Sequence, residues 1–287
     1  MSRRWRVALG LAPALALLAI VFGTALFGSL AQSLGHAPAY GVEAFPTLRY
    51  YRAVFSDAGV AAAAVRTLAT ALPATALGLL LGTALGLALP ARRDVASSLV
   101  QLPLLVPYVV AVALATVWLA GGGVIARLLA AASLIEVPQD LPRLLDGSAG
   151  VGVALTFVWK QAPFTALLVA AVRAGADPRL AEVAHVFGAT PLQRLRFVTL
   201  PQVMPAVLAA AVITLAYNLG ALEVPLLLGG GTRDTLAVSA WRVYADPDLT
   251  QRPQALAIAW TLTAFVVLTV AALLAAARRW LPGVAGR

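Results

Sequence analysis

The chain has 287 residues, of which 61% are hydrophobic and only 11% are charged, and its mean hydropathy is +0.89. This composition excludes a water-soluble globule and is typical of an integral membrane protein. The absence of cysteine excludes disulfides and thiolate metal sites. The net charge of +9 is scattered at the ends of apolar stretches without interleaved aromatic residues, so it does not indicate nucleic-acid binding.

Six apolar stretches are each long enough to cross a membrane, which requires roughly 20 helical residues. We therefore expect an all-α, polytopic membrane protein with six transmembrane helices. The first stretch resembles a secretory signal, but it is longer than the apolar part of such signals, so we interpret it as a retained span. In chain order the expected spans cover about residues 7–30, 68–89, 99–119, 151–172, 203–228 and 255–277.

Charges in the loops orient these spans, because Lys and Arg concentrate on the cytoplasmic side of a membrane. With the N-terminus inside, the cytoplasmic side carries twelve Arg and three acidic residues, a difference that equals the whole net charge of +9. The sequence thus predicts a multi-pass membrane protein with both termini in the cytoplasm.

Glycines recur every fourth residue in the second expected span, at Gly78, Gly82 and Gly86. Small residues at this spacing allow two membrane helices to approach closely. The spacing favours a packing seam inside the chain over a dimerisation face.

Ionisable residues inside a span need a partner or water, because an isolated charge at the centre costs roughly 2.5 to 3.5 kcal/mol on insertion scales. Lys160 and Gln161 lie near the middle of the fourth span, and Glu223 lies toward the outer end of the fifth, beyond Tyr217 and Asn218. One interpretation is that these five residues line a polar translocation path. The alternatives are a structural ion pair between Lys160 and Glu223, or a Glu223 side chain that reaches the membrane interface.

A helical hairpin is expected between the fourth and fifth spans. Asp177 and Pro178 predict a helix start, and Gly188 predicts a left-handed helix end. Thr190 then starts a second short helix as the N-cap of a capping box with Gln193. This helix carries Arg194 and Arg196, and Pro201 is expected to end or kink it. Leu180, Val183, Ala184 and Phe187 share one narrow apolar face of the first helix.

The hairpin contains a long motif with fixed spacing. Glu182 and Ala184 are followed by three residues, Gly188, nine residues, Val198, one residue, and Leu200-Pro201. This pattern resembles the EAA motif of the permeases of binding-protein-dependent ABC importers, with Val183 in place of the usual first Ala and Val198 in place of Ile. The resemblance extends over about residues 48–279.

The resemblance implies a type I ABC importer permease fold, with one transmembrane permease domain over residues 1–287, a core over 48–279 and a cytoplasmic coupling hairpin over 173–201. It also implies two separate ATP-binding subunits that hold ATP and Mg, a second identical or similar permease, and an extracytoplasmic solute-binding protein. The expected location is a prokaryotic inner membrane. The residues that would couple the chain to the ATPase are Glu182, Ala184, Gly188, Arg194, Arg196, Leu200 and Pro201.

The chain itself is expected to be neither an enzyme nor a cofactor-binding protein. It lacks the Gly-x4-Gly-Lys-Ser/Thr loop that cradles phosphates, and neither a metal-hydrolase nor a serine-hydrolase motif occurs. Residues 159–164 and 220–229 are similar to the spermidine/putrescine, ferric-iron and thiamine branch, which makes a polyamine the expected solute. The alternative is a secondary transporter or channel that uses Lys160 and Glu223 and needs no ATPase.

Overall fold

The computed structural model describes residues 3–89, 95–140, 144–145, 150–177, 179–229 and 234–280. The chain forms two compact units, one of Met1–Ala62 with Leu236–Ala264 and one of Ala63–Thr235 with Phe265–Arg287. That residues 1–287 act as a single permease domain stays a prediction.

The all-α prediction is confirmed, because most of the described residues are helical. Among them, six helical stretches are long and apolar enough to span a membrane: Leu9–Ser33, Ala58–Ala88, Tyr108–Ala131, Val151–Ala174, Pro191–Gly220 and Leu249–Arg278.

The first unit begins with a long helix, α1, whose apolar side chains are exposed as expected for contact with lipid. A small antiparallel sheet follows α1, and Ser33 Oγ lies 2.8 Å from the Tyr51 hydroxyl. Asp248 accepts hydrogen bonds from the hydroxyl and the amide of Thr250, and these bonds lower the pKa of its carboxyl. The elements are α1 (Arg3–Ser33), β1 (His36–Ala37), η1 (Pro38–Tyr40), β2 (Val42–Glu43), α2 (Arg49–Ser56), α12 (Leu236–Tyr244), η4 (Leu249–Gln251) and the first part of α13 (Arg252–Trp280).

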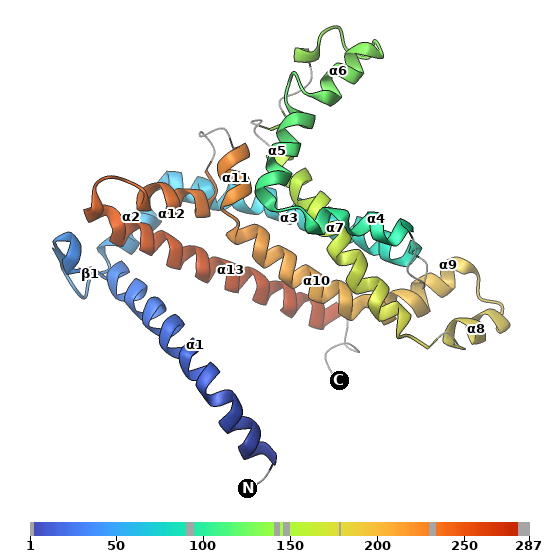
Figure 1. Cartoon of the computed structure of the whole chain (residues 1–287), viewed down its shortest axis with the longest axis horizontal. Helices are drawn as coiled ribbons and strands as arrows, with labels where there is room; N and C mark the ends of the chain where they lie inside the picture. Colours follow the sequence, from blue (N-terminus) through green and yellow to red (C-terminus); the bar gives the residue numbers. More distant parts are fainter. Residues whose placement is uncertain are drawn as a thin grey trace. The chain divides into compact units, whose positions relative to one another are not determined.

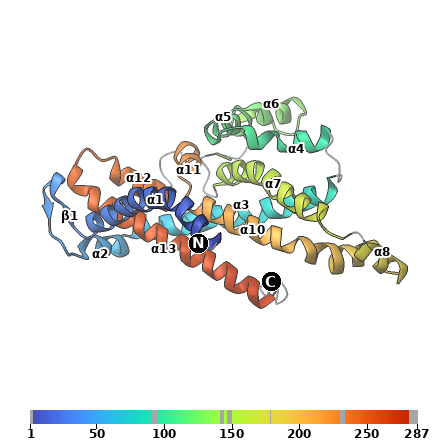
Figure 2. The ribbon, with the colours of Figure 1, turned by 60° about the horizontal axis from the view of Figure 1, so that its bottom comes forward.

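The second unit is built around α7, which packs against α4, α5, α10 and α11 (Figures 1 and 2). Its buried apolar residues include Phe157 of α7 and Val224 of α11. The elements are α3 (Ala58–Ala88, which starts in the first unit), α4 (Val95–Leu105), α5 (Tyr108–Leu119), α6 (Val124–Ala131), η2 (Pro138–Asp140), α7 (Val151–Ala174), α8 (Arg179–Val186), α9 (Pro191–Arg194), η3 (Leu195–Thr199), α10 (Leu200–Gly220), α11 (Glu223–Leu228) and the last part of α13.

Helices α3 and α7 meet along the predicted glycine seam. A Cβ atom on Gly82 would lie 2.5 Å from both the Ala162 carbonyl oxygen and Thr165 Cβ, and one on Gly86 would lie 2.7 Å from the Ala166 carbonyl oxygen. Real Cβ atoms do not approach so closely, so the two backbones can come together only because these positions lack a side chain. The prediction of an internal packing seam is confirmed.

The expected third span, over about residues 99–119, is not one continuous helix. Helix α4 ends at Leu105, Pro107 has extended backbone angles, and α5 starts at Tyr108. Pro107 has no N–H to continue the helix, and a proline disfavours helical geometry in the residue before it. Apolar composition continues across the break, which is why the hydropathy pattern does not show it.

The prediction of the fifth span over residues 203–228 is wrong at both ends. The helical stretch starts at Pro191 and leaves helical geometry at Ala221, whose ψ is 130°, before α11 begins at Glu223. In a continuous helix the ring of Pro225 would clash with the carbonyl of Ala221 four residues earlier. The helix is therefore interrupted at Ala221 and Leu222.

Candidate functional site

The hairpin between α7 and α10 forms as its local sequence dictates. The Asp177 carboxylate accepts a hydrogen bond from the Arg179 amide at 2.9 Å, as expected for a helix cap, while Pro178 lies outside the described residues. Gly188 has a φ of +80°. The Ala189 amide donates to the Ala184 carbonyl at 3.0 Å and the Gly188 amide donates to the His185 carbonyl at 2.9 Å. These two bonds form a Schellman motif, which confirms the predicted left-handed end of α8.

The second helix of the hairpin starts with the predicted capping box. The Gln193 amide donates to Thr190 Oγ1 at 3.3 Å, and the Thr190 amide donates to Gln193 Oε1 at 2.8 Å. Pro191 occupies the first helical position, where no N–H is required.

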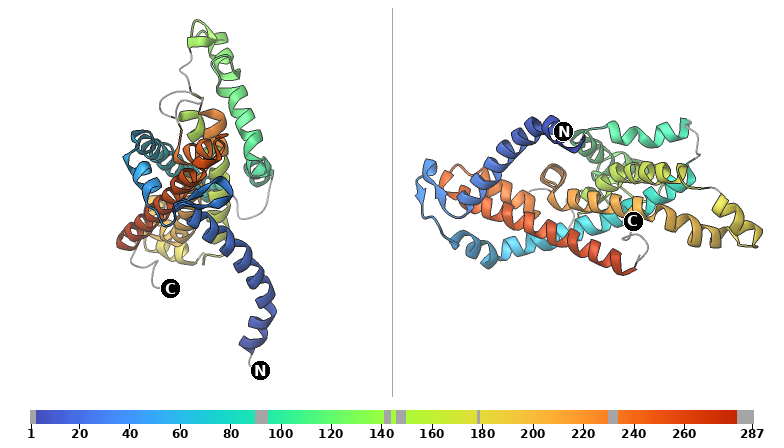
Figure 3. Two further views of the ribbon diagram at one scale, coloured as in Figure 1. Left: turned by 90° about the vertical axis from the view of Figure 1, so that its left-hand side faces the viewer. Right: turned by 90° about the horizontal axis from the view of Figure 1, so that it is seen from below.

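Pro201 does not end this second helix as expected. Residues Leu195–Thr199 form a π-helical turn, η3, and the helix continues through Pro201 into α10, so that one stretch runs from Pro191 to Gly220. A wider turn just before a proline absorbs the missing amide hydrogen bond without a break. The second helix of the hairpin and the fifth span are therefore one continuous rod, and α8 is joined to its end through the turn at Gly188 (Figures 1 and 3).

Large apolar side chains of the hairpin are exposed. Val186, Phe187 and Leu192 expose 84%, 86% and 73% of their surface, and Phe197 is also exposed. The sequence pattern identified Phe187, Val183 and Leu180 on the apolar face of α8, but it missed Val186, Leu192 and Phe197, which lie outside that stripe. Exposed apolar clusters of this kind mark surfaces that contact another protein or a membrane.

Charged residues flank this apolar surface. Glu182 and Arg196 are exposed, and Arg194 is half-buried, with no hydrogen-bond partner for its Nε among the described residues. Leu200 is half-buried and Pro201 exposed in the first turn of α10.

A second polar cluster lies deep among the spans around α7. Gln161 and Asn218 form a reciprocal amide pair, in which Gln161 Nε2 donates to Asn218 Oδ1 at 2.5 Å and Asn218 Nδ2 donates to Gln161 Oε1 at 3.1 Å. Asn218 Nδ2 also donates to Thr75 Oγ1 of α3 at 2.9 Å. All three residues are buried. The cluster ties α3, α7 and α10 together at one level of the bundle.

Three aromatic rings from three helices meet beside this cluster. The rings of Tyr108 and Tyr217 stack with their centroids 4.9 Å apart, and Phe157 meets them edge-on at 6.3 and 6.1 Å. Tyr108 is the first residue after the α4–α5 break, and Tyr217 precedes the amide-paired Asn218. The arrangement gives a wall with two aromatic faces next to amide groups.

Lys160 and Glu223 are not partners. The Lys160 ammonium, which is buried, donates to the backbone carbonyls of Pro103, Leu104 and Val106. Glu223 is exposed at the first position of α11. Of the alternatives for these charges, the structural ion pair therefore does not form.

The structure thus brings together Gln161, Tyr217 and Asn218 of the predicted path residues. Sequence reasoning missed Thr75, Tyr108 and Phe157. For Thr75 and Tyr108 a signal existed, because each follows within two residues of a proline in an otherwise apolar span. For Phe157 no signal separates it from the other apolar residues of α7.

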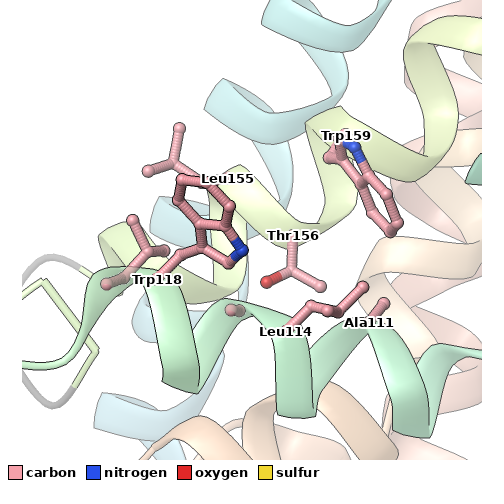
Figure 4. Close-up of a pocket in the computed structure, with 8 residues that line it drawn as sticks. Ala111, Leu114, Trp118, Leu155, Thr156 and Trp159 are labelled. Carbon is pink, nitrogen blue, oxygen red and sulfur yellow. The ribbon is translucent and has the colours of Figure 1, made fainter. Parts of the chain in front are cut away.

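On another side of α7, a pocket of about 430 Å³ lies between α7 and α5. Figure 4 shows Trp118 of α5 and Trp159 of α7 on either side of Thr156, with Leu114 and Leu155 among the remaining walls. The lining is predominantly apolar, and the Thr156 hydroxyl donates to the Gly152 carbonyl at 2.8 Å.

Comparison with known proteins decides the family. Residues 74–282, which include both the hairpin and the polar cluster, match the family described as binding-protein-dependent transport system inner membrane component. The chain belongs to this family. The trehalose transport system permease protein SugA of Mycobacterium tuberculosis is 30% identical over 202 residues, which are 68% of this chain and 63% of SugA.

Solved structures share the fold of this permease family member. A bacterial ABC transporter involved in the import of the acidic polysaccharide alginate has a TM-score of 0.75 at 21% identity, with 96% of each chain covered. The same kind of transporter in complex with an alginate pentasaccharide-bound periplasmic protein has a TM-score of 0.76 at 20% identity, covering 97% of this chain and 96% of that one. The family assignment agrees with the EAA resemblance, whereas the expected polyamine, ferric-iron and thiamine branch is not confirmed.

Proposed function

We propose that this chain is the membrane-spanning permease subunit of an ABC importer in a bacterial inner membrane, with both termini in the cytoplasm. The observation that carries the proposal is the family match over residues 74–282, which spans the hairpin and the buried polar cluster in one unit. The alternative of a secondary transporter or channel relied on Lys160 and Glu223 acting together, and these two charges are not paired.

The hairpin is proposed to couple the chain to an ATP-binding subunit. Its exposed apolar residues would enter a cleft of that subunit, with Glu182, Arg194 and Arg196 contributing charged contacts at the rim. The rod from Pro191 to Gly220 supports this role, because a rotation of the hairpin would turn α10 directly. Ala184 and Gly188 hold the hairpin angle through the Schellman motif, and Leu200 and Pro201 start the span.

The translocation path is proposed to pass the aromatic and amide wall beside α7. Gln161, Tyr217 and Asn218 form that wall together with Tyr108, and the exposed Glu223 stands at the start of α11. Lys160 belongs to the same region, although its ammonium is directed to backbone carbonyls.

A polar carbohydrate is the proposed solute class. The ring of Tyr217, which stacks on Tyr108 and remains partly exposed, offers a flat aromatic face that suits the face of a sugar ring. The relatives are named for trehalose and alginate. The polyamine expected from residues 159–164 and 220–229 is the second candidate, and the exposed carboxylate of Glu223 is the feature that favours it.

The partners follow from the same proposal. Two ATP-binding subunits would hold ATP and Mg, a second identical or similar permease would complete the path, and a solute-binding protein outside the membrane would deliver the solute. The chain itself would transmit motion and catalyse no bond breakage.

Reconstitution in liposomes tests this function. The chain would be purified with its ATP-binding and solute-binding partner proteins, and uptake of labelled trehalose and labelled spermidine would be measured with and without ATP. We expect ATP-dependent uptake of the disaccharide that excess spermidine does not inhibit. Uptake that follows an ion gradient and needs no ATP would contradict the proposal, and ATP-dependent uptake of spermidine alone would contradict its carbohydrate part.

A further inference from the structure

The environment of Lys160 is unusual for a charged residue inside a membrane span. Its Nζ lies 2.5 Å from the carbonyl oxygen of Val106, 2.6 Å from that of Pro103 and 3.4 Å from that of Leu104. A lysine ammonium has three N–H donors and no acceptor, so these contacts engage all of its hydrogen-bonding capacity. The side chain is 7% exposed. No donor is left for a solute.

The three carbonyls belong to the point where α4 ends before Pro107. The last carbonyls of a helix have no partner within the helix, and they form the negative end of its dipole. Non-helical backbone at membrane depth is tolerated only where neighbouring groups satisfy it. Lys160 supplies both the donors and the positive charge that this helix end lacks.

The same break leads directly into the aromatic wall. Tyr108 follows Pro107, its ring lies 5.1 Å from Lys160 Nζ, and it stacks on Tyr217. The next residue on α7, Gln161, holds α10 through Asn218. Two adjacent residues of α7 therefore fix the two helices that carry the stacked tyrosines.

We propose that Lys160 is a positioning residue, an internal cation that occupies the carbonyl cage at the α4–α5 break and thereby holds Tyr108 against Tyr217. It makes no contact with the solute. Removal of the ammonium leaves an open cage of Pro103, Leu104 and Val106 carbonyls that accepts another small alkylammonium ion. The uptake measurement described below rests on the proposed transport function, whereas the labelling measurement does not.

Arg173 offers a matched control on the same helix. Its guanidinium donates to the carbonyls of Leu87 and Leu89 at the end of α3, so it also satisfies a helix end with a cation. No aromatic stack depends on that end among the described residues of the second unit. Loss of Arg173 should therefore lower stability without releasing the α4–α5 break.

The experiment uses a single cysteine at the break, because the chain contains no other cysteine. Val106 is half-buried, so the maleimide labelling rate of Val106→Cys reports how far the break opens. We expect Lys160→Ala to raise this rate about tenfold, as for the loss of a charge-assisted hydrogen bond, and Arg173→Ala to change it less than about twofold. In Lys160→Ala, n-propylammonium replaces the deleted atoms and should restore slow labelling and part of the uptake. Tetramethylammonium has the same charge but no N–H donor and should restore neither.

An unchanged labelling rate in Lys160→Ala, an equal increase in Arg173→Ala, or equal rescue by tetramethylammonium would each overturn the proposal. If Lys160→Ala does not insert, Lys160→Arg keeps a charged donor near the cage and should label at the parent rate, and fast labelling would count against the proposal. Labelling needs neither ATP nor solute. A chain that labels as expected but transports nothing would contradict the proposed function and leave the role of Lys160 standing.

Discussion

Single polar side chains inside the spans stabilise the bundle by forming hydrogen bonds with one another or with backbone carbonyls. Gln161 and Asn218 pair through their amides, and Thr75 accepts from the same Asn218 nitrogen. Lys160 and Arg173 bind the ends of α4 and α3. Each of these groups would be costly alone in hydrocarbon, so each depends on its particular partner.

Replacing one member of the amide pair should cost more than replacing both. Gln161→Leu or Asn218→Leu leaves one buried amide without its partner and should lower the free energy of unfolding by about 0.6 to 1.7 kcal/mol. The double variant should lose less than the sum of the two single losses, because no amide is then stranded. Thermal unfolding of the four proteins in detergent measures this coupling, with Thr263→Val, an exposed change on α13, as a control. Additive losses would show that the pair does not act as a unit.

Many residues of the site could be predicted from the sequence, but the hydrogen-bond partner of each residue could not. Lys160, Gln161, Tyr217, Asn218 and Glu223 stand out because polar residues are rare in apolar spans. Their partners are set by tertiary structure. The Lys160 ammonium donates to three backbone carbonyls, and carbonyls carry no sequence signature. The carboxylate partner that the sequence offered as one alternative is not the one found in the structure.

At the scale of elements, local signals predict ends and caps well. The Asp177 cap, the left-handed Gly188 and the Thr190 capping box all form as expected. The effect of a proline is less predictable, because a helix can either continue past it or break near it. Pro201 follows a π-helical turn and the helix continues, whereas Pro107 and Pro225 accompany breaks. Hydropathy reports burial in lipid and is insensitive to these differences.

The close contact of α3 with α7 predicts a large effect of one methyl group. Gly82→Ala should lower the free energy of unfolding by about 1 to 3 kcal/mol, because the new Cβ meets the Ala162 carbonyl and Thr165 and the helices must separate. Gly28→Ala on α1 meets nothing within 4 Å and should be neutral. Melting temperatures of the purified proteins check the contrast, and equal values for both variants would refute the packing seam.

Substitutions in the hairpin should uncouple solute transport from ATP turnover without unfolding the protein. Gly188→Val places a side chain in a left-handed conformation at a cost of about 1 to 2 kcal/mol, and Glu182→Lys reverses an exposed charge. Both variants should insert and melt close to the parent, but should lose solute-stimulated ATP turnover in liposomes.

Gly41→Val is a matched control for the hairpin glycine, because Gly41 also has a positive φ, of 73°, with open space around it. It should show a similar stability cost and normal turnover. Normal turnover in both hairpin variants would remove the coupling role of the motif.

At the scale of the whole molecule, we propose that motion of the hairpin, on the cytoplasmic side, changes the aromatic and amide wall. The second helix of the hairpin continues into α10 without interruption, and α10 carries Tyr217 and Asn218 to the wall. The family match supports this proposal. Fold class and family were accessible from composition and the motif, because both are properties of the sequence. The class of solute was not, and the expected polyamine branch is not confirmed.

Site-specific cross-linking tests the coupling claim most directly. Since the chain has no cysteine, Phe187→Cys and Leu128→Cys introduce single thiols at exposed apolar positions of α8 and α6. Each variant would be treated with a short thiol-to-amine cross-linker in membranes that also contain the partner ATP-binding subunit. The account predicts a cross-linked product of this chain with the ATP-binding subunit for Phe187→Cys, with a yield that changes on ATP addition, and none for Leu128→Cys. No product for Phe187→Cys, or equal products from both positions, would contradict it.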